Sequence, residues 1–409
     1  MAVNPMRILS LQPVVKGFRT NPRAGGKDKA ALEICRALAR SGHSIDLLAM
    51  PWGLEPAQEE LLGQSFSVLL SDDGLSARAL PTLSRPSPGD ITRLVKHLLS
   101  IKGALRRPSE IFSRLLWASM TRKEQSLVRA VRETSYDLFI NHQTGSDAPL
   151  VLRRHGVRRP LVLVHHSNGL SPFLELYDFV VFVSGTQEEA ALARYPDLKG
   201  RTRVIRYFLD PAFSRSCNPR PVPELTFAAV LDNDNKGLDL LLRAFVEDRR
   251  LRHLHLNVIG EGRSRSKWEE YARDNSLPVR FLGKMSADGI AEVLSRTGAF
   301  VMPSKAESFG IVYLEALAMG VPIIGFAPSV TEITGLVGMD VGFGFRREAD
   351  SLSDLADRIL ELTREGSGID PVRRSMIAER VRETFSVEAF HRRWVSLVNQ
   401  GLSSTAGSD

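Results

Sequence analysis

Two glutamates, Glu307 and Glu315, flank a Phe-Gly pair in the stretch 306–320, AESFGIVYLEALAMG, with seven residues between them. Carboxylates accept hydrogen bonds from sugar and ribose hydroxyls, and the remaining residues are apolar enough to bury a helix. The stretch therefore indicates a buried helix with two carboxylates facing a polyhydroxylated ligand. The alternative is a glutamate that complements the helix dipole together with an ordinary surface carboxylate.

A lysine and two histidines are further candidates. Lys236 precedes a glycine at a predicted helix start, where its charge and free N–H groups together suit a phosphate. His142 follows one predicted strand and His166 ends another, although a lone histidine at a strand end is more often a core residue. For His165 we expect that structural role.

The triplet Asp232-Asn233-Asp234 has the D-x-D pattern that holds a divalent metal in some sugar-transfer enzymes. Asp and Asn before a helix are also ordinary caps and loop formers. We favour caps here, and we assign no metal ligands and no cofactor.

Short apolar runs alternate with amphipathic segments along the chain, which is typical of an α/β fold with parallel sheets. A Pro-rich passage, 210–225, separates two such series. We infer two domains and not one long sheet, because a single core stops growing at roughly 250–300 residues. We predict an N-terminal domain over 1–207, a second domain over 208–387, and a terminal helix with a polar tail over 388–409. Expected strands include 6–11, 44–50, 136–141, 160–166, 179–184, 225–231, 254–260, 279–283, 299–304 and 321–326.

The order of these motifs resembles the retaining glycosyltransferases of family 4, also called glycosyl transferases group 1. ESFGIVYLE resembles their paired-glutamate signature, AGGKDKA their first Gly-Gly loop, YDLFINH and LVLVHHSNG their histidine-bearing strand ends, and NKGLDLLLRAF their Lys-Gly helix start. The resemblance implies the GT-B fold, two doubly wound Rossmann-like domains facing a cleft. It makes 1–207 the acceptor-side domain and 208–387 the nucleotide-sugar-binding domain. It leaves open whether the C-terminal helix returns to the N-terminal domain.

The resemblance also implies a role for each matching residue. Glu307 and Lys236 would hold the donor sugar and its diphosphate, and His142 would lie near the reacting carbon. Glu315 would bind the nucleotide ribose, and His166 would line the cleft. The remaining donor-binding residues would be Gly25, Gly26, Phe281, Leu282, Gly283, Ser308, Phe309, Gly310 and Ile311.

One position departs from the family pattern. Leu231 stands where the family usually has an arginine, five residues before the lysine, so one of two diphosphate cations is missing. A charge-assisted contact of this kind is worth roughly 1.5–3 kcal/mol. Either another cation replaces it, with Arg206, Arg243 and Lys284 as candidates, or the protein is a catalytically silent relative.

The stretch 91–132 is strongly basic, with ten lysines and arginines against two glutamates. Its apolar residues keep helical spacing, so two interpretations stay open. It forms either core-packed helices with solvated basic faces or a peripheral surface for an anionic membrane. The second would suit a lipid or lipid-linked acceptor.

Composition limits the remaining classes. The net charge of +7 favours an anionic partner, while two distant cysteines and no apolar run of spanning length indicate a cytoplasmic protein that is peripheral to a membrane at most. GEGRSR lacks the third glycine of a dinucleotide fingerprint, and the basic stretch lacks interleaved aromatic residues for nucleic acid.

These patterns predict a metal-independent retaining glycosyltransferase. It would move a sugar from a UDP-, GDP- or related nucleotide sugar to a hydroxyl acceptor in cell-envelope polysaccharide or glycolipid assembly. The alternatives are a silent GT-B protein that binds nucleotide or a partner enzyme, and a nucleotide-sugar epimerase. The epimerase would need acid–base carboxylates that the sequence does not show.

Overall fold

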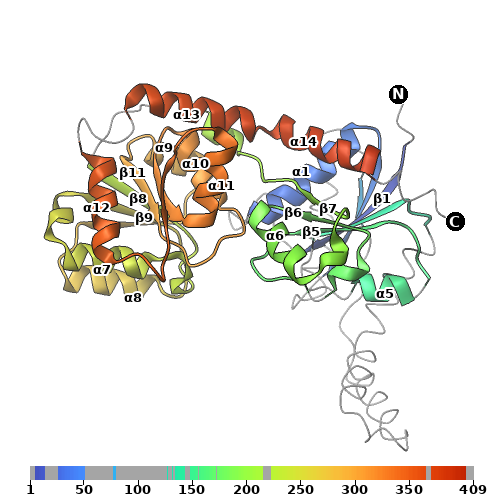
Figure 1. Ribbon diagram of the computed structural model, residues 1–409, viewed down its shortest axis with the longest axis horizontal. Helices are drawn as coiled ribbons and strands as arrows, with labels where there is room; N and C mark the ends of the chain where they lie inside the picture. The colour runs from blue at the N-terminus through green and yellow to red at the C-terminus, as the bar shows by residue number, and fades with distance from the viewer. Residues whose placement is uncertain are drawn as a thin grey trace, which may run out of the picture. The chain divides into compact units, whose positions relative to one another are not determined.

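The structure is a computed structural model. It describes residues 5–13, 26–50, 77–79, 127, 131, 134–142, 148–154, 156–171, 173–214, 223–364 and 370–401. The chain divides into two compact units. The first comprises the described residues within Met1–Val181, Tyr195–Arg203 and Trp394–Asp409, and the second those within Phe182–Arg194 and Val204–Arg393. Each unit contains one sheet with helices packed around it (Figure 1).

The first sheet has seven strands in the order β3-β2-β1-β4-β5-β6-β7. The strands β4, β5 and β6 are buried along their whole length, as expected for a sheet covered on both faces. Their bounds, in chain order, are β1 Arg7–Pro13, β2 Ser44–Met50, β3 Ala77–Ala79, β4 Leu138–Asn141, β5 Leu161–His165, β6 Phe179–Phe182 and β7 Thr202–Val204. The helices of this part of the chain are α1 Gly26–Arg40, α5 Ala148–Arg154 and α6 Gly185–Arg194.

The second sheet has six strands in the order β10-β9-β8-β11-β12-β13. All its pairings are parallel. The strands are β8 Glu224–Ala228, β9 His255–Ile259, β10 Val279–Gly283, β11 Ala299–Met302, β12 Ile323–Phe326 and β13 Gly342–Phe345. The doubly wound α/β class that the sequence predicted is therefore confirmed in both units.

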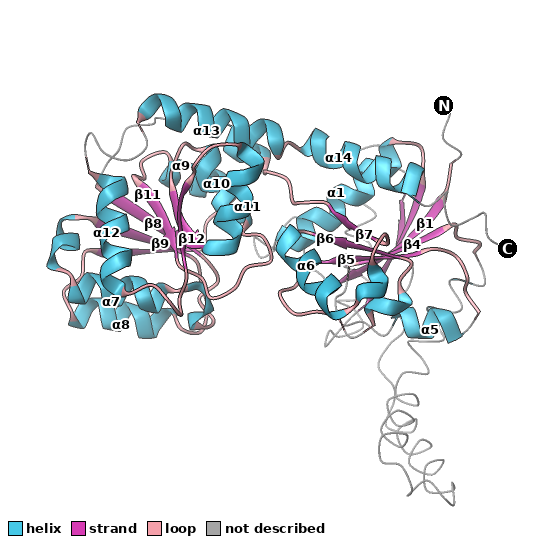
Figure 2. Ribbon diagram, viewed as in Figure 1, coloured by secondary structure: helices cyan, strands magenta, loops and turns pink. Residues whose placement is uncertain are grey.

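Helices cover both faces of the second sheet (Figure 2). The helices α7 and α12 pack against each other, while α10 and α11 both pack against α13. The bounds are α7 Leu238–Glu247, α8 Arg265–Asp274, α9 Ala287–Leu294, α10 Ile311–Ala318, α11 Ala327–Val337, α12 Leu352–Thr363 and α13 Pro371–Thr384. These helices bury long apolar residues, among them Leu241, Phe245, Leu314, Ile333 and Ile359.

The C-terminal region contains elements that the sequence analysis did not single out. The helix α13 begins with Pro371, and the Asp370 side chain caps it by accepting from two backbone N–H groups. The helix α14, Val387–Ser396, and a π-helical turn at Leu397–Gly401 occupy the expected terminal helix. Its return to the N-terminal domain and the boundaries at 207 and 387 stay predictions.

Some expectations lie outside the described residues. These are Gly25, the tail after residue 401, and the basic stretch 91–132 apart from Leu127 and Val131. None of the helices in the described ranges has the length and apolar character needed to cross a bilayer.

Candidate functional site

The carboxyl ends of the second sheet bring two loops together. The strand β8 leads outward to β9 and β10, whereas its other neighbour β11 leads outward to β12 and β13. The chain therefore changes direction between β8 and β11, and in open α/β sheets this switch point is the usual place for a ligand. The loops that meet there are 229–237, after β8, and 303–310, after β11.

Lys236 and Glu307 join these two loops directly. The Lys236 Nζ lies 2.7 Å from Glu307 Oε1, and the Ser304 hydroxyl donates to the same oxygen over 2.7 Å. The Glu307 side chain is only 8% exposed and that of Lys236 is 32% exposed. A carboxylate buried to this degree needs such partners, because an unpaired charge there would be costly. The structure thus brings together two residues that the sequence placed 71 positions apart.

The backbone reinforces this junction. The Lys305 N–H donates to the Asn235 carbonyl over 2.8 Å. Gly237, which caps α7, has φ of 82°, and a Cβ on it would lie 2.3 Å from the Pro303 carbonyl oxygen. Only glycine fits this left-handed position against the neighbouring loop. Lys236 therefore sits on a turn that is packed closely against the loop of Glu307.

The helix α10, which carries Glu315, is anchored by a buried tyrosine. Tyr313 donates from its hydroxyl to the Met302 carbonyl over 2.9 Å and accepts from the Phe326 N–H over 3.0 Å. Burial raises the pKa of this hydroxyl. A Cβ on either Gly310 or Gly325 would overlap the tyrosine ring. Gly310 therefore leaves room for the Tyr313 ring, whose two hydrogen bonds fix α10 to β11 and β12.

The backbone N–H groups at the start of α10 have no side-chain cap. Gly310 caps the helix in a left-handed conformation, and no side chain caps the first turn. Backbone N–H groups at such a helix start, together with the helix dipole, favour an anion. Ser308 and Ile311 flank this position, Phe309 is buried beside Phe385, and Glu315 is half-buried in the second turn.

The strand β10 ends in a bulge. Its pairing with β9 shifts register between Phe281 and Gly283, and the Gly283 carbonyl accepts from the Gly260 N–H over 2.7 Å. Leu282 is exposed within this bulge. The segment Phe281–Gly283, expected among the donor-binding residues, therefore lies at the same end of the sheet as Lys236.

Leu231 is buried against the loop that follows β9. It is 3% exposed, its N–H donates to the Glu261 carbonyl over 2.9 Å, and its own carbonyl accepts from Ser264 over 2.7 Å. The proposed replacement cations Arg206 and Arg243 each lie beside an acid. Arg206 pairs with Glu332 at 2.7 Å, and Arg243 lies 3.8 Å from Glu247.

The D-x-D acids each lie beside a cation. Arg263 Nε is 3.8 Å from Asp232, and Lys267 Nζ is 3.6 Å from Asp234. The Asn233 side chain caps the turn by accepting from the Asn235 N–H. In the part of the chain that the structure describes, no three His, Cys, Asp or Glu residues gather in a way that could hold a metal.

The histidines form a buried group in the first unit. His142 Nδ1 lies 3.4 Å from His166 Nε2, and the two rings are nearly parallel at 21°. Burial lowers the pKa of His142 to about 3 and that of His165 to about 4, so both imidazoles are neutral at pH 7. Adjacent strand residues point to opposite faces, which separates His165 from the His142–His166 pair.

Ser304 is the site residue that sequence reasoning missed. Its signal was its place as the first polar residue after the buried strand β11, three positions before Glu307. Gly26 is the first residue of α1.

Comparisons with known proteins find a matching family, several relatives and similar solved structures. Residues 222–365 match the family described as Glycosyl transferases group 1. A GDP-mannose-dependent monoacylated alpha-(1-6)-phosphatidylinositol monomannoside mannosyltransferase of Corynebacterium glutamicum is 33% identical over 207 residues, or 47% of each chain. A phosphatidyl-myo-inositol mannosyltransferase of Propionibacterium freudenreichii is 33% identical over 151 residues, 34% of this chain and 37% of the relative. The chain thus matches about half or less of these relatives.

Solved structures resemble the whole chain. HepE of Anabaena, in complex with UDP and glucose, superposes with a TM-score of 0.64 at 17% identity, covering 97% of this chain and 100% of that one. Sucrose-phosphate synthase of Thermosynechococcus elongatus gives 0.65 at 18% identity, covering 98% and 100%. At these identities the likeness shows the fold, which confirms the GT-B type. The family match confirms the resemblance to group 1 glycosyl transferases for the second sheet and its helices.

The buried histidines predict a pH-dependent stability. Below about pH 6.5 the unfolded chain protonates His142 and His165, whereas the folded chain does not until about pH 3 and 4. The free energy of unfolding should therefore fall as the pH drops from about 6.5 towards 4, by up to about 1.4 kcal/mol per pH unit for each histidine.

Denaturant unfolding at pH 7, 6 and 5 measures this effect. His142→Asn should lose less stability than the wild type between pH 7 and 5, while His255→Asn, at an exposed position, should keep the wild-type dependence. Parallel curves for His142→Asn and the wild type would contradict the assignment.

Proposed function

We propose that this protein is a retaining glycosyltransferase that moves a hexosyl or related sugar from a nucleotide-diphosphate donor to a hydroxyl acceptor without a metal ion. One observation carries the proposal. Lys236, Glu307 and Ser304 meet at the switch point of a sheet whose residues 222–365 match group 1 glycosyl transferases. The named activities of the mannosyltransferase relatives support a glycan or lipid-linked acceptor in cell-envelope polysaccharide or glycolipid assembly.

Each site residue takes a role that its chemistry allows. The Glu307 carboxylate accepts hydrogen bonds from sugar hydroxyls, and Lys236 neutralises the diphosphate together with N–H groups at the start of α10. Glu315 binds the ribose. The backbone of Phe281–Gly283 contacts the base edge. Further donor contacts come from Gly25, Gly26, Ser308, Phe309, Gly310 and Ile311.

The reaction breaks the bond between the anomeric carbon and the diphosphate oxygen and forms a bond from that carbon to the acceptor oxygen. The acceptor proton passes to the departing diphosphate on the same face, so configuration is retained. Negative charge grows on the diphosphate as it leaves, and Lys236 with the α10 N–H groups stabilises it. His142, neutral at pH 7 and in contact with His166, contributes hydrogen bonds near the reacting carbon.

A second candidate function is supported by Leu231. Because its side chain is an uncharged hydrocarbon and is buried, it cannot supply the diphosphate contact of the family arginine. A silent protein would bind nucleotide or a partner enzyme without transfer. A panel of nucleotide sugars tested for thermal protection separates the two when combined with a transfer assay. A ligand at 100 times its dissociation constant adds about 2.7 kcal/mol, and protection without turnover favours the silent protein.

Substitution of the junction residues should abolish transfer. We expect Glu307→Gln and Lys236→Ala each to lower kcat/KM by about tenfold to a hundredfold or more, because each removes a charge-assisted contact worth about 1.5–3 kcal/mol. Steady-state transfer assays measure this. Glu292→Gln, on the exposed side of α9, is the matched control and should keep wild-type rates. Wild-type turnover in either junction variant would show that the donor site lies elsewhere.

Transfer should continue in excess EDTA. Asp232 and Asp234 each lie beside a cation, and Lys236 supplies the charge that a metal would otherwise provide. The measurement is the initial rate with and without chelator. A rate that disappears in EDTA and returns with Mn²⁺ or Mg²⁺ would restore the metal interpretation of the D-x-D triplet.

We further propose that the protein is cytoplasmic and that the basic stretch 91–132 binds the inner face of an anionic membrane. About 1 kcal/mol per engaged basic residue makes four side chains sufficient for reversible binding. Co-sedimentation should show binding to anionic vesicles at 0.1 M salt, lost towards 1 M as the Debye length falls from about 10 Å to 3 Å. Replacing Lys96, Lys102, Arg106 and Arg107 with glutamine should abolish binding. Wild-type protein that stays in the supernatant at low salt would contradict the proposal.

A further inference from the structure

Arg347 connects a distant part of the second unit to the turn that carries Lys236. Its Nη1 donates to the Asp234 carbonyl over 2.8 Å, and its Nη2 lies 2.5 Å from Asp239 Oδ2. Asp234 and Lys236 are the two ends of one 3-10 turn, Asp234–Lys236, and Asp239 lies in the first turn of α7. One guanidinium therefore holds both the turn before the helix and the helix itself.

The topology explains how Arg347 reaches this place. The strand β13 is at the edge of the sheet, but the helix that follows it, α12, packs against α7 on the far side of β11. The segment 346–351 must therefore cross the carboxyl end of the sheet, past the loops that hold Lys236 and Glu307.

The crossing segment is itself a well-fixed turn. The Arg346 carbonyl accepts from the N–H groups of Ala349 and Asp350, and the Asp350 side chain accepts from the Arg346 N–H over 2.6 Å. A capping box at Ser351 and Asp354 then starts α12. The backbone of Arg347 is thus part of a hydrogen-bonded turn.

The electrostatics require this arginine. The Asp239 side chain is 14% exposed and that of Arg347 is 24% exposed. Burial raises the pKa of Asp239, the nearby charge of Asp234 raises it further, and Arg347 acts in the opposite direction. Without Arg347, the Asp239 carboxylate would lose its ion-pair partner, and the Asp234 carbonyl would lose a hydrogen-bond donor. The turn would then be held by the Lys305 N–H on the Asn235 carbonyl and by the ion pairs of Asp234 with Lys267 and of Lys236 with Glu307.

We propose that Arg347 is a positioning residue of the donor site, which fixes the Asp234–Lys236 turn so that the Lys236 ammonium lies where the donor diphosphate binds. This inference rests on the proposed function. Arg347 acts through Lys236 and does not itself contact the donor. Because a displacement of about 1 Å in a binding group can cost a hundredfold, the attachment controls the strength of diphosphate binding.

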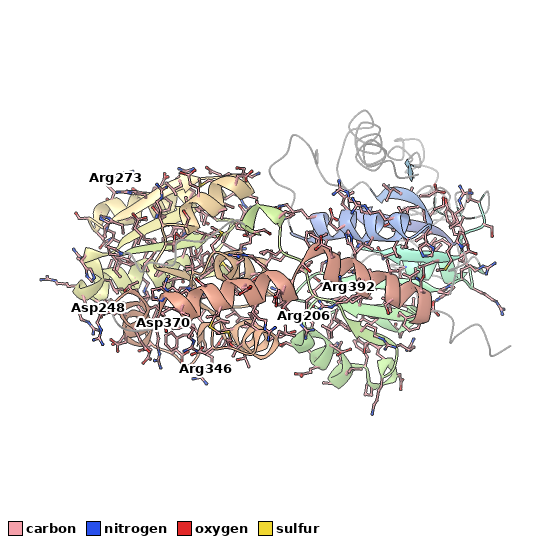
Figure 3. The ribbon with its side chains drawn as sticks, turned by 90° about the horizontal axis from the view of Figure 1, so that it is seen from above. Arg206, Asp248, Arg273, Arg346, Asp370 and Arg392 are labelled. Carbon is pink, nitrogen blue, oxygen red and sulfur yellow. The ribbon has the colours of Figure 1, made fainter. Side chains whose placement is uncertain are left out.

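The neighbouring arginine provides a matched control. Arg346 is 68% exposed and lies 3.3 Å from Asp350, which its backbone already binds. Figure 3 labels it on the outer surface of the second unit. Arg346→Ala removes the same charge one position away without releasing the Lys236 turn.

The experiment measures binding of UDP, GDP and ADP by calorimetry. Arg347→Ala should weaken binding of the preferred nucleotide by about tenfold, Arg347→Lys by less, and Arg346→Ala should match the wild type. Thermal unfolding and binding stoichiometry, measured on each variant, identify any loss of folded protein. Asp239→Asn, which keeps an acceptor for Arg347, should fall between wild type and Arg347→Ala.

A double-mutant cycle with Lys236→Ala distinguishes positioning from direct contact. If Arg347 acts through Lys236, then Arg347→Ala should have little further effect once Lys236 is replaced. Equal effects in both backgrounds would overturn the positioning role, as would wild-type affinity in Arg347→Ala. Failure of the wild type to bind any of the three nucleotides would overturn the proposed function as well.

Discussion

The ion pair between Lys236 and Glu307 is the interaction on which the candidate site depends. It joins the loops that follow β8 and β11, two strands that are neighbours in space but lie far apart in the chain. Glu307 is nearly buried, so its charge must be balanced within the site, and Lys236 with the Ser304 hydroxyl does this. The surrounding features serve this junction: Gly237 allows the loops to approach, Tyr313 fixes α10, and Arg347 holds the turn of Lys236.

The acids at the carboxyl end of the second sheet are paired with basic residues, whereas the buried histidines of the first unit are neutral. In the second unit, acids and bases at the carboxyl end of the sheet are paired, as with Asp232, Asp234 and Asp239, each beside a basic residue. In the first unit, burial lowers the pKa of His142 and His165, so their imidazoles are neutral at pH 7. A donor with a diphosphate suits the first arrangement, and a neutral hydroxyl acceptor suits the second. This division agrees with the proposed assignment of donor and acceptor to different domains.

Leu231 is buried at the position where the family pattern has an arginine. Its side chain is buried, and its backbone binds the loop after β9 through Glu261 and Ser264. An arginine at this position would have to leave that packing to reach a phosphate. The donor diphosphate would then depend more strongly on Lys236 and on the helix start at Gly310, which makes accurate placement of the Lys236 turn more important than in a site with two cations.

The sequence by itself determined the fold class and most element positions, and it predicted Glu307 and Lys236 as candidate donor-site residues. Strand periodicity and breaker residues are local, and the family motifs are contiguous, so 44–50 was predicted with the bounds of β2. The helix α13 was not singled out, because its basic residues, including the buried Arg374, obscure the apolar period. The sequence could not show that Arg347 meets Asp239, 108 positions away, or that Leu231 is buried. Only the tertiary structure decides these contacts, since the first depends on the crossing of the chain from β13 to α12 and the second on packing against the loop after β9.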